Sequence, residues 1–220
     1  MRGCVIIPAY NEEMTIGPVV REIRAKGLDC VVVNDGSSDK TRQVAEHEGA
    51  YVISHPKNYG KGTSLTDGFR YSLNRNYNYI ITMDGDGQHN PDEIDNFLKV
   101  AEKGDTQIVL GNRMCNPKDM PLIRRLTNRF MSLFISSIVH QKLPDSQCGF
   151  RLIKSEVLKV IACTATKYEI ESEVIIRAAR AGFKIKSIPI RSIYKGEKSQ
   201  IRPVADTLRF IAFILKTGLK

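Results

Sequence analysis

The first half of the chain repeats one block: a short apolar run, a polar turn, and a segment with helical periodicity. Short runs rich in Val and Ile predict buried strands at 4–7, 30–33, 51–54, 79–83 and 107–110. Between them apolar residues recur at helical spacing, as at Val19, Val20 and Ile23. Strand and helix alternating over short links predict an α/β fold: a mostly parallel sheet with helices on both faces.

Polar, glycine-containing turns follow these strands. In a parallel sheet they line one edge, where nucleotides bind in open α/β folds. We expect Asn11 to cap the first helix, with Glu12 and Glu13 in its first turn. The G-x-G-x-x-G fingerprint is not found after the first strand, which argues against a dehydrogenase.

Two carboxylates, Asp84 and Asp86, directly follow the strand at 79–83 and alternate with glycines. Two hard anionic ligands at a strand end suit Mg²⁺ or Mn²⁺. A polar turn before a helix capped by Asn90 is the alternative reading. A calcium loop fits poorly, because its sixth position would be His89 instead of Gly and its twelfth Asp95 instead of Glu.

The pattern changes after residue 113. A polar loop leads to a predicted helix over 122–139, and a compact polar turn at 145–151 precedes predicted helices over 155–161 and 170–181 and a strand over 184–190. The last predicted helix, 203–216, is apolar on a broad face and basic elsewhere. We expect one domain over 1–202, with a nucleotide-sugar half over 1–113 and an acceptor half over 114–202, followed by an amphipathic helix over 203–220.

Charge and composition narrow the possible partners. The net charge of +9 and the isoelectric point near 9.3 favour anionic partners. Four of the five cysteines lie in or beside apolar runs without C-x-x-C spacing, which predicts buried free thiols in a reducing cytosol. The chain shows neither a signal peptide nor an apolar run long enough to span a bilayer.

Five motifs occur in the order typical of family 2 glycosyltransferases. They are PAYNE at 8–12, VNDGSSD at 33–39, DGDGQH at 84–89, GNR at 111–113 and DSQCGFR at 145–151. Over about residues 4–200 the chain most closely resembles the branch of dolichyl-phosphate mannose synthases and polyprenyl-phosphate glucosyltransferases. This resemblance implies a GT-A fold and an inverting transfer from a UDP- or GDP-sugar.

The resemblance also assigns roles to individual positions. Asp84 and Asp86 match the metal and diphosphate site, and Gln88 matches a third contact to Mg²⁺ or Mn²⁺. His89 is expected to be structural. The positions expected to bind the nucleotide sugar are Pro8, Tyr10, Glu12, Asp35, Lys61 and Asp84.

The acceptor half carries the remaining expectations. A hydroxyl acceptor needs a general base, whereas a phosphate acceptor arrives ionised and needs cations to position it. Asp86, through the metal, and Asp145 are the expected catalytic residues; Asp145 either orients an arginine or acts as base, and Glu171 is the rival base. The candidates for contacts to an acceptor phosphate, drawn from a wider basic cluster that includes Arg151, are Arg113, Arg129, Ser199 and Arg202.

A polyprenyl phosphate lies in a bilayer, so we expect peripheral attachment to the cytoplasmic face of the membrane or a membrane partner protein. The segments 122–139 and 203–216 are candidates for surface contact, with packing on the core as the alternative. Transfer to a sugar hydroxyl is the second possible function. A sugar nucleotidyltransferase would carry a glycine-rich loop after its first strand, and this chain has PAYNE at 8–12 instead. A nucleic-acid-binding module would need aromatic residues interleaved with the basic ones. The sequence does not show them, so no nucleic-acid partner is expected.

Overall fold

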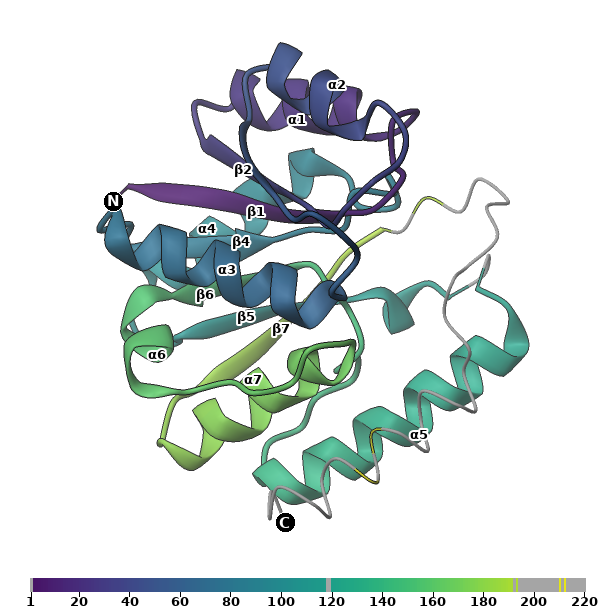
Figure 1. Cartoon of the computed structure of the whole chain (residues 1–220). Helices are drawn as coiled ribbons and strands as arrows, with labels where there is room; N and C mark the ends of the chain where they lie inside the picture. The colour runs from purple at the N-terminus through teal and green to yellow at the C-terminus, as the bar shows by residue number, and fades with distance from the viewer. Residues whose placement is uncertain (1, 118–119, 192, 194–209, 211, 213–220) are drawn as a thin grey trace.

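The computed structural model describes residues 2–117, 120–191, 193, 210 and 212. Its centre is one seven-stranded sheet with the strand order β3-β2-β1-β4-β6-β5-β7 (Figure 1). The predicted mostly parallel sheet is confirmed, because every neighbouring pair is parallel except the two that involve β6. The strands are β1 Gly3–Ala9, β2 Asp29–Asn34, β3 Tyr51–Ser54, β4 Tyr79–Thr82, β5 Ile108–Asn112, β6 Arg151–Lys154 and β7 Ile185–Pro189.

Helices cover both faces of this sheet because its central strands are apolar on both sides. In β1, Cys4 and Ile6 face one apolar cluster, and Val5 and Ile7 face the other. The first cluster is closed by α3, α5, α6 and α7, and the second by α1, α2 and α4. The helices are α1 Ile16–Ala25, α2 Thr41–His47, α3 Lys61–Asn74, α4 Ile94–Glu102, α5 Leu122–Val139, α6 Ser155–Val160 and α7 Glu169–Arg180, with short 3₁₀ turns η1 Pro91–Glu93 and η2 Arg113–Cys115.

The antiparallel strand β6 was not predicted. The sequence indicated only a polar turn at 145–151 followed by a helix, because the apolar run Leu152-Ile153 is too short to stand out. In the structure β6 lies between β4 and β5, with Thr82 opposite Arg151 and Leu110 opposite Arg151 on the other side. The end of the polar turn is thereby placed beside the end of β4.

The predicted start of the first helix is wrong. α1 begins at Ile16, with Thr15 before it and no acidic residue in its first turn. Asn11 has a φ of 57°, a left-handed conformation that a capping residue does not adopt. Residues 11–15 instead form a loop that is hydrogen-bonded to the loop after β2.

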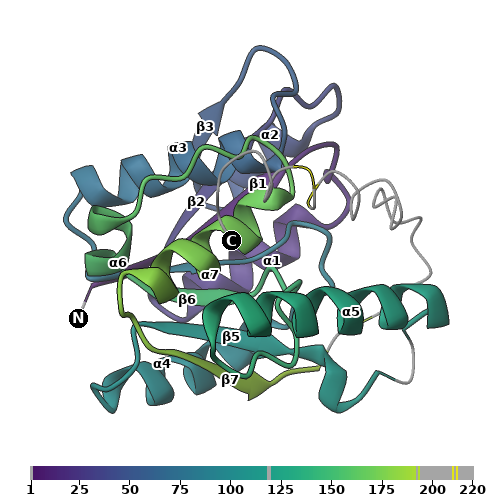
Figure 2. The same cartoon turned by 90° about the horizontal axis from the view of Figure 1, so that it is seen from below.

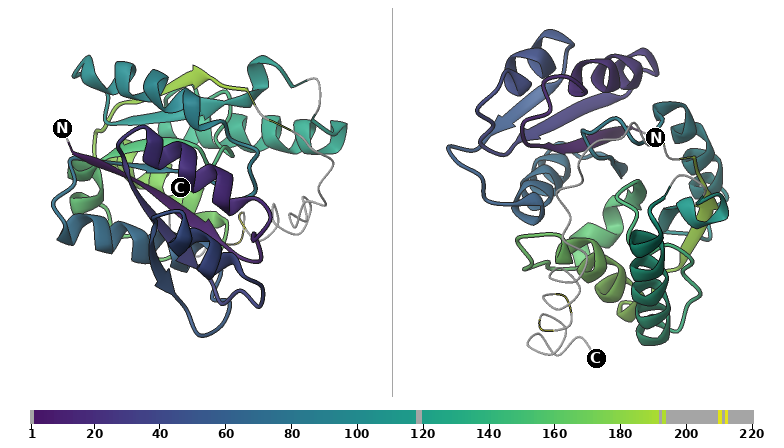
Figure 3. Two further views of the ribbon diagram at one scale, coloured as in Figure 1. Left: turned by 90° about the horizontal axis from the view of Figure 1, so that it is seen from above. Right: turned by 90° about the vertical axis from the view of Figure 1, so that its right-hand side faces the viewer.

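The predicted helices over 122–139 and 170–181 are confirmed as α5 and α7. Figures 2 and 3 show α5 alongside α7, on the opposite side of the molecule from α2. The predicted C-terminal helix lies mostly outside the described residues. Two of its members, Phe210 and Ala212, are helical, and the ring of Phe210 packs edge-on against Phe134 of α5, with 6.2 Å between centroids. The division of the chain into donor and acceptor halves stays a prediction.

Candidate active site

Three loops meet where β2, β1 and β4 end side by side. Ala9 of β1 lies opposite Asn34 of β2, and the Asp35 amide donates to the Ala9 carbonyl at 2.9 Å. Pro8 and Tyr10, expected to contact the nucleotide, are half-buried at this junction. Their position fits the edge at which open α/β sheets bind ligands.

The loop after β1 is clamped onto the loop after β2. Backbone amides of Asn11, Glu12 and Glu13 donate to Ser37 Oγ, Thr41 Oγ1 and Asp39 Oδ2 at 3.0, 2.7 and 3.1 Å. These side-chain acceptors take the place of a regular helix start, which explains why α1 begins late.

Glu12 also connects this loop to the one after β4. The Thr15 hydroxyl lies 2.9 Å from Glu12 Oε2 and 2.8 Å from the carbonyl oxygen of Gly85. The carboxylate expected to contact the nucleotide is thus held beside the glycine that separates Asp84 from Asp86.

Asp35 is almost fully enclosed by hydrogen-bond donors, and its residue is only 3% exposed. Its Oδ1 accepts from the amide of Tyr59 at 2.9 Å and faces His55 Nδ1 at 2.7 Å. Its Oδ2 accepts from the amide of Gly60 at 2.8 Å. Asp35 therefore fixes the loop after β3 in addition to marking the end of β2.

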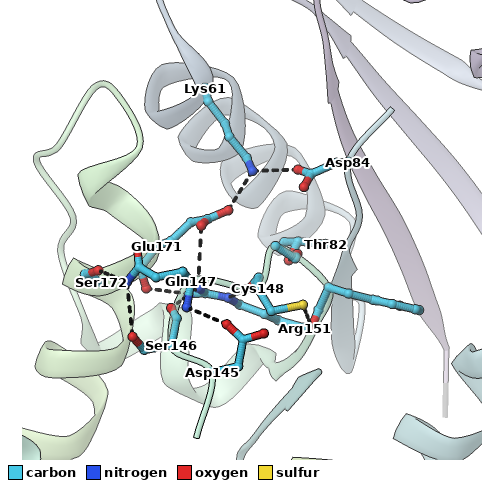
Figure 4. Close-up of polar contacts among 12 residues, drawn as sticks. Lys61, Thr82, Asp84, Asp145, Ser146, Gln147, Cys148, Arg151, Glu171 and Ser172 are labelled. Carbon is cyan, nitrogen blue, oxygen red and sulfur yellow. Dashed lines mark hydrogen bonds and ion pairs between the residues drawn. The ribbon is translucent and has the colours of Figure 1, made fainter. Parts of the chain in front are cut away.

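Lys61 lies between two carboxylates from different parts of the chain. Its Nζ is 2.5 Å from Asp84 Oδ1 and 2.6 Å from Glu171 Oε1 of α7 (Figure 4). Burial alone would lower the pKa of Lys61, but the charges of Asp84 and Glu171 outweigh it and raise that pKa above its usual range. The ammonium is charged at neutral pH and joins α3, the loop after β4 and α7.

Glycines on both sides of Lys61 allow this placement. Gly60 has a φ of 98°, and a Cβ on Gly62 would lie 2.5 Å from the carbonyl oxygen of Ala165. The start of α3 thus lies directly against the segment that precedes α7, which brings Lys61 within reach of Glu171.

The loop after β4 carries Asp84 and Asp86, with Gly85 between them. Gly87 has a φ of 70°, and the Gln88 amide donates to Asp86 Oδ1 at 3.0 Å. Burial alone would raise the pKa of Asp84, but the charge of Lys61 above all lowers it below its usual range. A Cβ on Gly149 would lie 2.7 Å from Asp84 Oδ2, so a larger residue here would displace this carboxylate.

His89 is buried beneath the same loop and stacks on Phe150 with 5.2 Å between ring centroids. Its Nδ1 accepts from the Asp84 amide at 3.3 Å. Burial lowers the pKa of His89 to about 4, so the ring is neutral at physiological pH. These contacts agree with the expected structural role.

Asp84 and Asp86 match the ligands that Mg²⁺ and Mn²⁺ use when a nucleotide supplies the rest. No group of three or more His, Cys, Asp or Glu side chains suited to a metal exists among the described residues. A cation held by one or two carboxylates plus substrate phosphates and waters is the usual arrangement for Mg²⁺. The two carboxylates of this loop therefore fit a metal that arrives with a diphosphate.

Asp145 forms a buried ion pair with Arg113. Arg113 Nε and Nη2 donate to its two oxygens at 2.8 and 3.0 Å, and the Arg113 amide adds a bond at 3.1 Å. Burial alone would raise the pKa of Asp145, but the charge and hydrogen bonds of Arg113 lower it below its usual range. Of the two roles expected for Asp145, the geometry agrees with orienting an arginine.

Arg151, expected to belong to the basic cluster of the acceptor half, is buried in the fold. It is 2% exposed, and its guanidinium donates to carbonyl oxygens of Ser146, Cys148 and Glu171. Its Nη2 also lies 3.7 Å from Glu171 Oε2. Arg151 is the first residue of β6, a central strand of the sheet. Its side chain holds the turn at 145–150 against α7 (Figure 4).

Glu171 and Glu173 have separate surroundings. Glu173 is fully buried and accepts from the amides of Thr164 and Ala165, each at 2.8 Å, whereas Glu171 faces Lys61. Glu173 shapes the segment that contacts Gly60 and Gly62, and Glu171 faces the site.

The expected acceptor contacts are only partly brought together. Arg129 is exposed on α5 and, with Arg125, Leu133 and Lys142, helps to line a pocket of about 600 Å³ that reaches Met114, the neighbour of Arg113. Ser199 and Arg202 lie outside the described residues. The structure therefore links Arg129 and the Arg113 segment by a shared pocket and leaves the other two positions as predictions.

Four residues with contacts in this site were not predicted from the sequence: His55, Asp67, Thr15 and Gly149. His55 directly follows β3, so its place at a strand end was a usable signal. Contacts of Thr15 with Gly85 and of Gly149 with Asp84 join distant segments and left no local pattern.

Comparison with known proteins assigns the chain to one family. Residues 4–162 match the model of glycosyl transferase family 2. The UDP-N-acetylglucosamine–dolichyl-phosphate N-acetylglucosaminyltransferase of Methanococcus voltae is 30% identical over 213 residues, covering 86% of this chain and 85% of its own. The undecaprenyl-phosphate mannosyltransferase of Micrococcus luteus is 29% identical over 204 residues, covering 86% and 83%.

Solved structures agree on the fold. Glucosyl-3-phosphoglycerate synthase from Mycobacterium tuberculosis, crystallised with Mn²⁺, uridine diphosphate and phosphoglyceric acid, superposes with a TM-score of 0.75 at 21% identity over 98% of this chain and 78% of that one. The expected GT-A fold is thereby confirmed, and the names of the relatives support the polyprenyl-phosphate branch. The chain belongs to glycosyl transferase family 2 and is a glycosyltransferase.

Proposed function

We propose that this glycosyltransferase moves a sugar, with inversion, from a UDP- or GDP-sugar to a polyprenyl phosphate, using Mg²⁺ or Mn²⁺. One observation carries the choice of acceptor: each candidate base is already engaged by a cation. Asp145 is held by Arg113 through three hydrogen bonds, and Glu171 lies 2.6 Å from Lys61.

A carboxylate whose pKa is lowered by an ion pair is a weak base, as for Asp145. A phosphate acceptor needs no base, since its oxygen is already ionised. The dolichyl-phosphate and undecaprenyl-phosphate in the names of the two relatives support the same acceptor class. Transfer to a sugar hydroxyl would require one of these two carboxylates to leave its cation.

In the proposed step, an oxygen of the acceptor phosphate bonds to the anomeric carbon of the sugar. The bond from that carbon to the diphosphate oxygen breaks, and its electron pair leaves with the diphosphate. A divalent cation, when bound, stabilises the charge on that leaving group. Asp84 and Asp86 would hold the cation, and Lys61, within hydrogen-bond reach of Asp84, adds a fixed positive charge.

Around this step, Pro8, Tyr10, Glu12 and Asp35 would hold the nucleoside at the ends of β1 and β2. Asp145 would act as a positioning residue for Arg113, which with Arg129, Ser199 and Arg202 would attract the acceptor phosphate.

A polyprenyl phosphate acceptor lies in a bilayer, so we propose that the enzyme is a peripheral protein at the cytoplasmic face of the membrane. None of the helices within the described ranges is long and apolar enough to cross a bilayer. α5 exposes a stripe of Leu122, Ile123, Leu126, Phe130 and Leu133, flanked by the exposed Arg125 and Arg129. Apolar side chains bordered by arginines suit an anionic lipid surface.

The test compares two acceptors that differ only in their head group. Radiolabelled UDP- and GDP-sugars are incubated with polyprenyl phosphate or the matching polyprenol, with Mn²⁺. Label is expected in the polyprenyl phosphate alone, and to be lost in Asp86→Asn. Equal transfer to polyprenol would overturn the proposed acceptor and restore a base-dependent mechanism.

A further inference from the structure

Asp35 has its hydrogen-bonding capacity mostly filled before any ligand arrives. A carboxylate accepts about four hydrogen bonds, two on each oxygen. In this chain Oδ1 faces His55 Nδ1 at 2.7 Å and accepts from the Tyr59 amide at 2.9 Å, so both of its positions are taken. Oδ2 accepts only from the Gly60 amide at 2.8 Å, which leaves one position.

His55 is fixed in this arrangement. Its Nε2 lies 3.1 Å from Asp67 Oδ2, so the ring is held between two carboxylates, and its side chain is 8% exposed. The Tyr59 ring packs against it at 63° with 5.3 Å between centroids. Carboxylates face both ring nitrogens, and the contact at Nδ1 is the shorter of the two, so the geometry favours donation from Nδ1, which keeps Oδ1 occupied.

The single remaining acceptor position suits a base edge with one donor and disfavours an edge with two adjacent donors, which separates the two expected donors, UDP- and GDP-sugars. Uracil offers one N–H between two carbonyl oxygens, whereas guanine offers two adjacent donors, N1–H and N2–H₂. Two parallel donors need both carboxylate oxygens, and here one oxygen is closed. This step rests on the proposed function, in which Asp35 faces the base of the donor.

We infer that the donor is a uridine diphosphate sugar, and that His55 determines this specificity by filling Oδ1 of Asp35. A guanine base would leave one buried N–H without a partner. A penalty of that kind lowers affinity by roughly ten- to hundred-fold. His55 contacts Asp35 and not the base, so it is a positioning residue.

Calorimetry with UDP, GDP and CDP in the presence of Mn²⁺ tests the inference. UDP is expected to bind roughly ten- to hundred-fold more tightly than GDP to the natural chain. In His55→Ala, Oδ1 regains a free position, so the ratio should fall to within about threefold. His55→Asn places an amide nitrogen near the position of Nδ1 and should keep the preference for UDP.

The matched control is His47→Ala, because His47 is exposed on α2 and should leave the ratio unchanged. GDP or CDP binding as tightly as UDP would overturn the inference while leaving a nucleotide-dependent transferase in place. Failure of all three to bind would overturn the donor site itself. An unchanged ratio in a folded His55→Ala would overturn the role of His55.

Discussion

Lys61 occupies the position beside Asp84 that a divalent cation would also seek. With its Nζ 2.5 Å from Asp84 Oδ1, the ammonium balances the carboxylate while no nucleotide is bound. Two cations at one carboxylate oxygen repel each other strongly at short range. The metal must therefore compete with Lys61 or arrive with a diphosphate that neutralises both.

Lys61→Met should bind Mn²⁺ roughly tenfold more tightly in the absence of nucleotide, because the competing charge is gone. Electron paramagnetic resonance of free Mn²⁺ measures this directly. Lys99→Met, an exposed change on α4, serves as the control. Equal Mn²⁺ affinity in the variant and the natural chain would show that the lysine does not compete.

A second residue-scale prediction concerns Asp145 and pH. Since the pKa of Asp145 is lower in the folded chain than in the unfolded one, the ion pair stabilises the fold above the unfolded value, near 4. That stabilisation is lost as the pH falls through the folded pKa. Breaking the buried pair in Asp145→Asn should cost about 3 kcal/mol at pH 7.

Melting temperatures from pH 3 to 8 should show this loss as a gap of several degrees at pH 7 that narrows below about pH 4. Asp92→Asn, at an exposed carboxylate, should produce a small gap throughout. A gap for Asp145→Asn that stays constant with pH would exclude the ion pair as its cause.

At the scale of elements, α5 is the helix with two different surfaces. Its inner side packs Met131, Ile135 and Val139 into the core. Its outer stripe leaves Leu126 and Phe130 more than half exposed, next to Arg129. The apolar pattern of the sequence located the helix, and the structure identifies which of its apolar residues are exposed.

Replacing Leu126 and Phe130 by Ser should reduce co-sedimentation with phosphatidylglycerol vesicles by at least about tenfold, without lowering the melting temperature. The loss follows from removing apolar area that the bilayer would bury. Val160→Ser, at an exposed apolar site on α6, is the matched control. Unchanged sedimentation would assign the stripe to a protein contact.

At the scale of the whole molecule, thiol reactivity reports how well the core is closed. Cys4, Cys30 and Cys148 are buried and Cys163 is partly buried, and burial raises the pKa of each to about 12. Cys115 is exposed. A disulfide reagent at pH 7.5 should label one thiol rapidly and the other four only after denaturation.

Cys115→Ser should abolish the rapid phase, and Cys163→Ser should leave it intact. More than one rapidly labelled thiol in the natural chain would indicate an opening of the core near the sheet.

Much of this architecture could be predicted because it depends on local patterns. The six strands other than β6 and the positions of α5 and α7 follow from apolar periodicity, and the strand-end rule placed Asp35 and Asp84 at one edge. The late start of α1, the contact of Arg151 with Glu171 and the contact of His55 with Asp35 join residues 20 or more positions apart. Such contacts arise from packing, and although the strand end marked the position of His55, no sequence spacing identified its partner.

The reversal of β6 has a consequence for how the family diversifies. β5 ends at Asn112, and Arg151 at the start of β6 pairs with Leu110, so the chain leaves the sheet after Asn112 and returns beside the same strand. The segment 113–150, with α5 and the Asp145 turn, therefore forms one excursion between two paired strands. Such a cassette can be exchanged between relatives without shifting the register of any strand, provided that Gly149 is kept behind Asp84. Since Arg113, Arg129 and Asp145 are the proposed acceptor-side residues, a designed chimera that exchanges this segment is expected to change the acceptor preference and to keep the nucleotide preference.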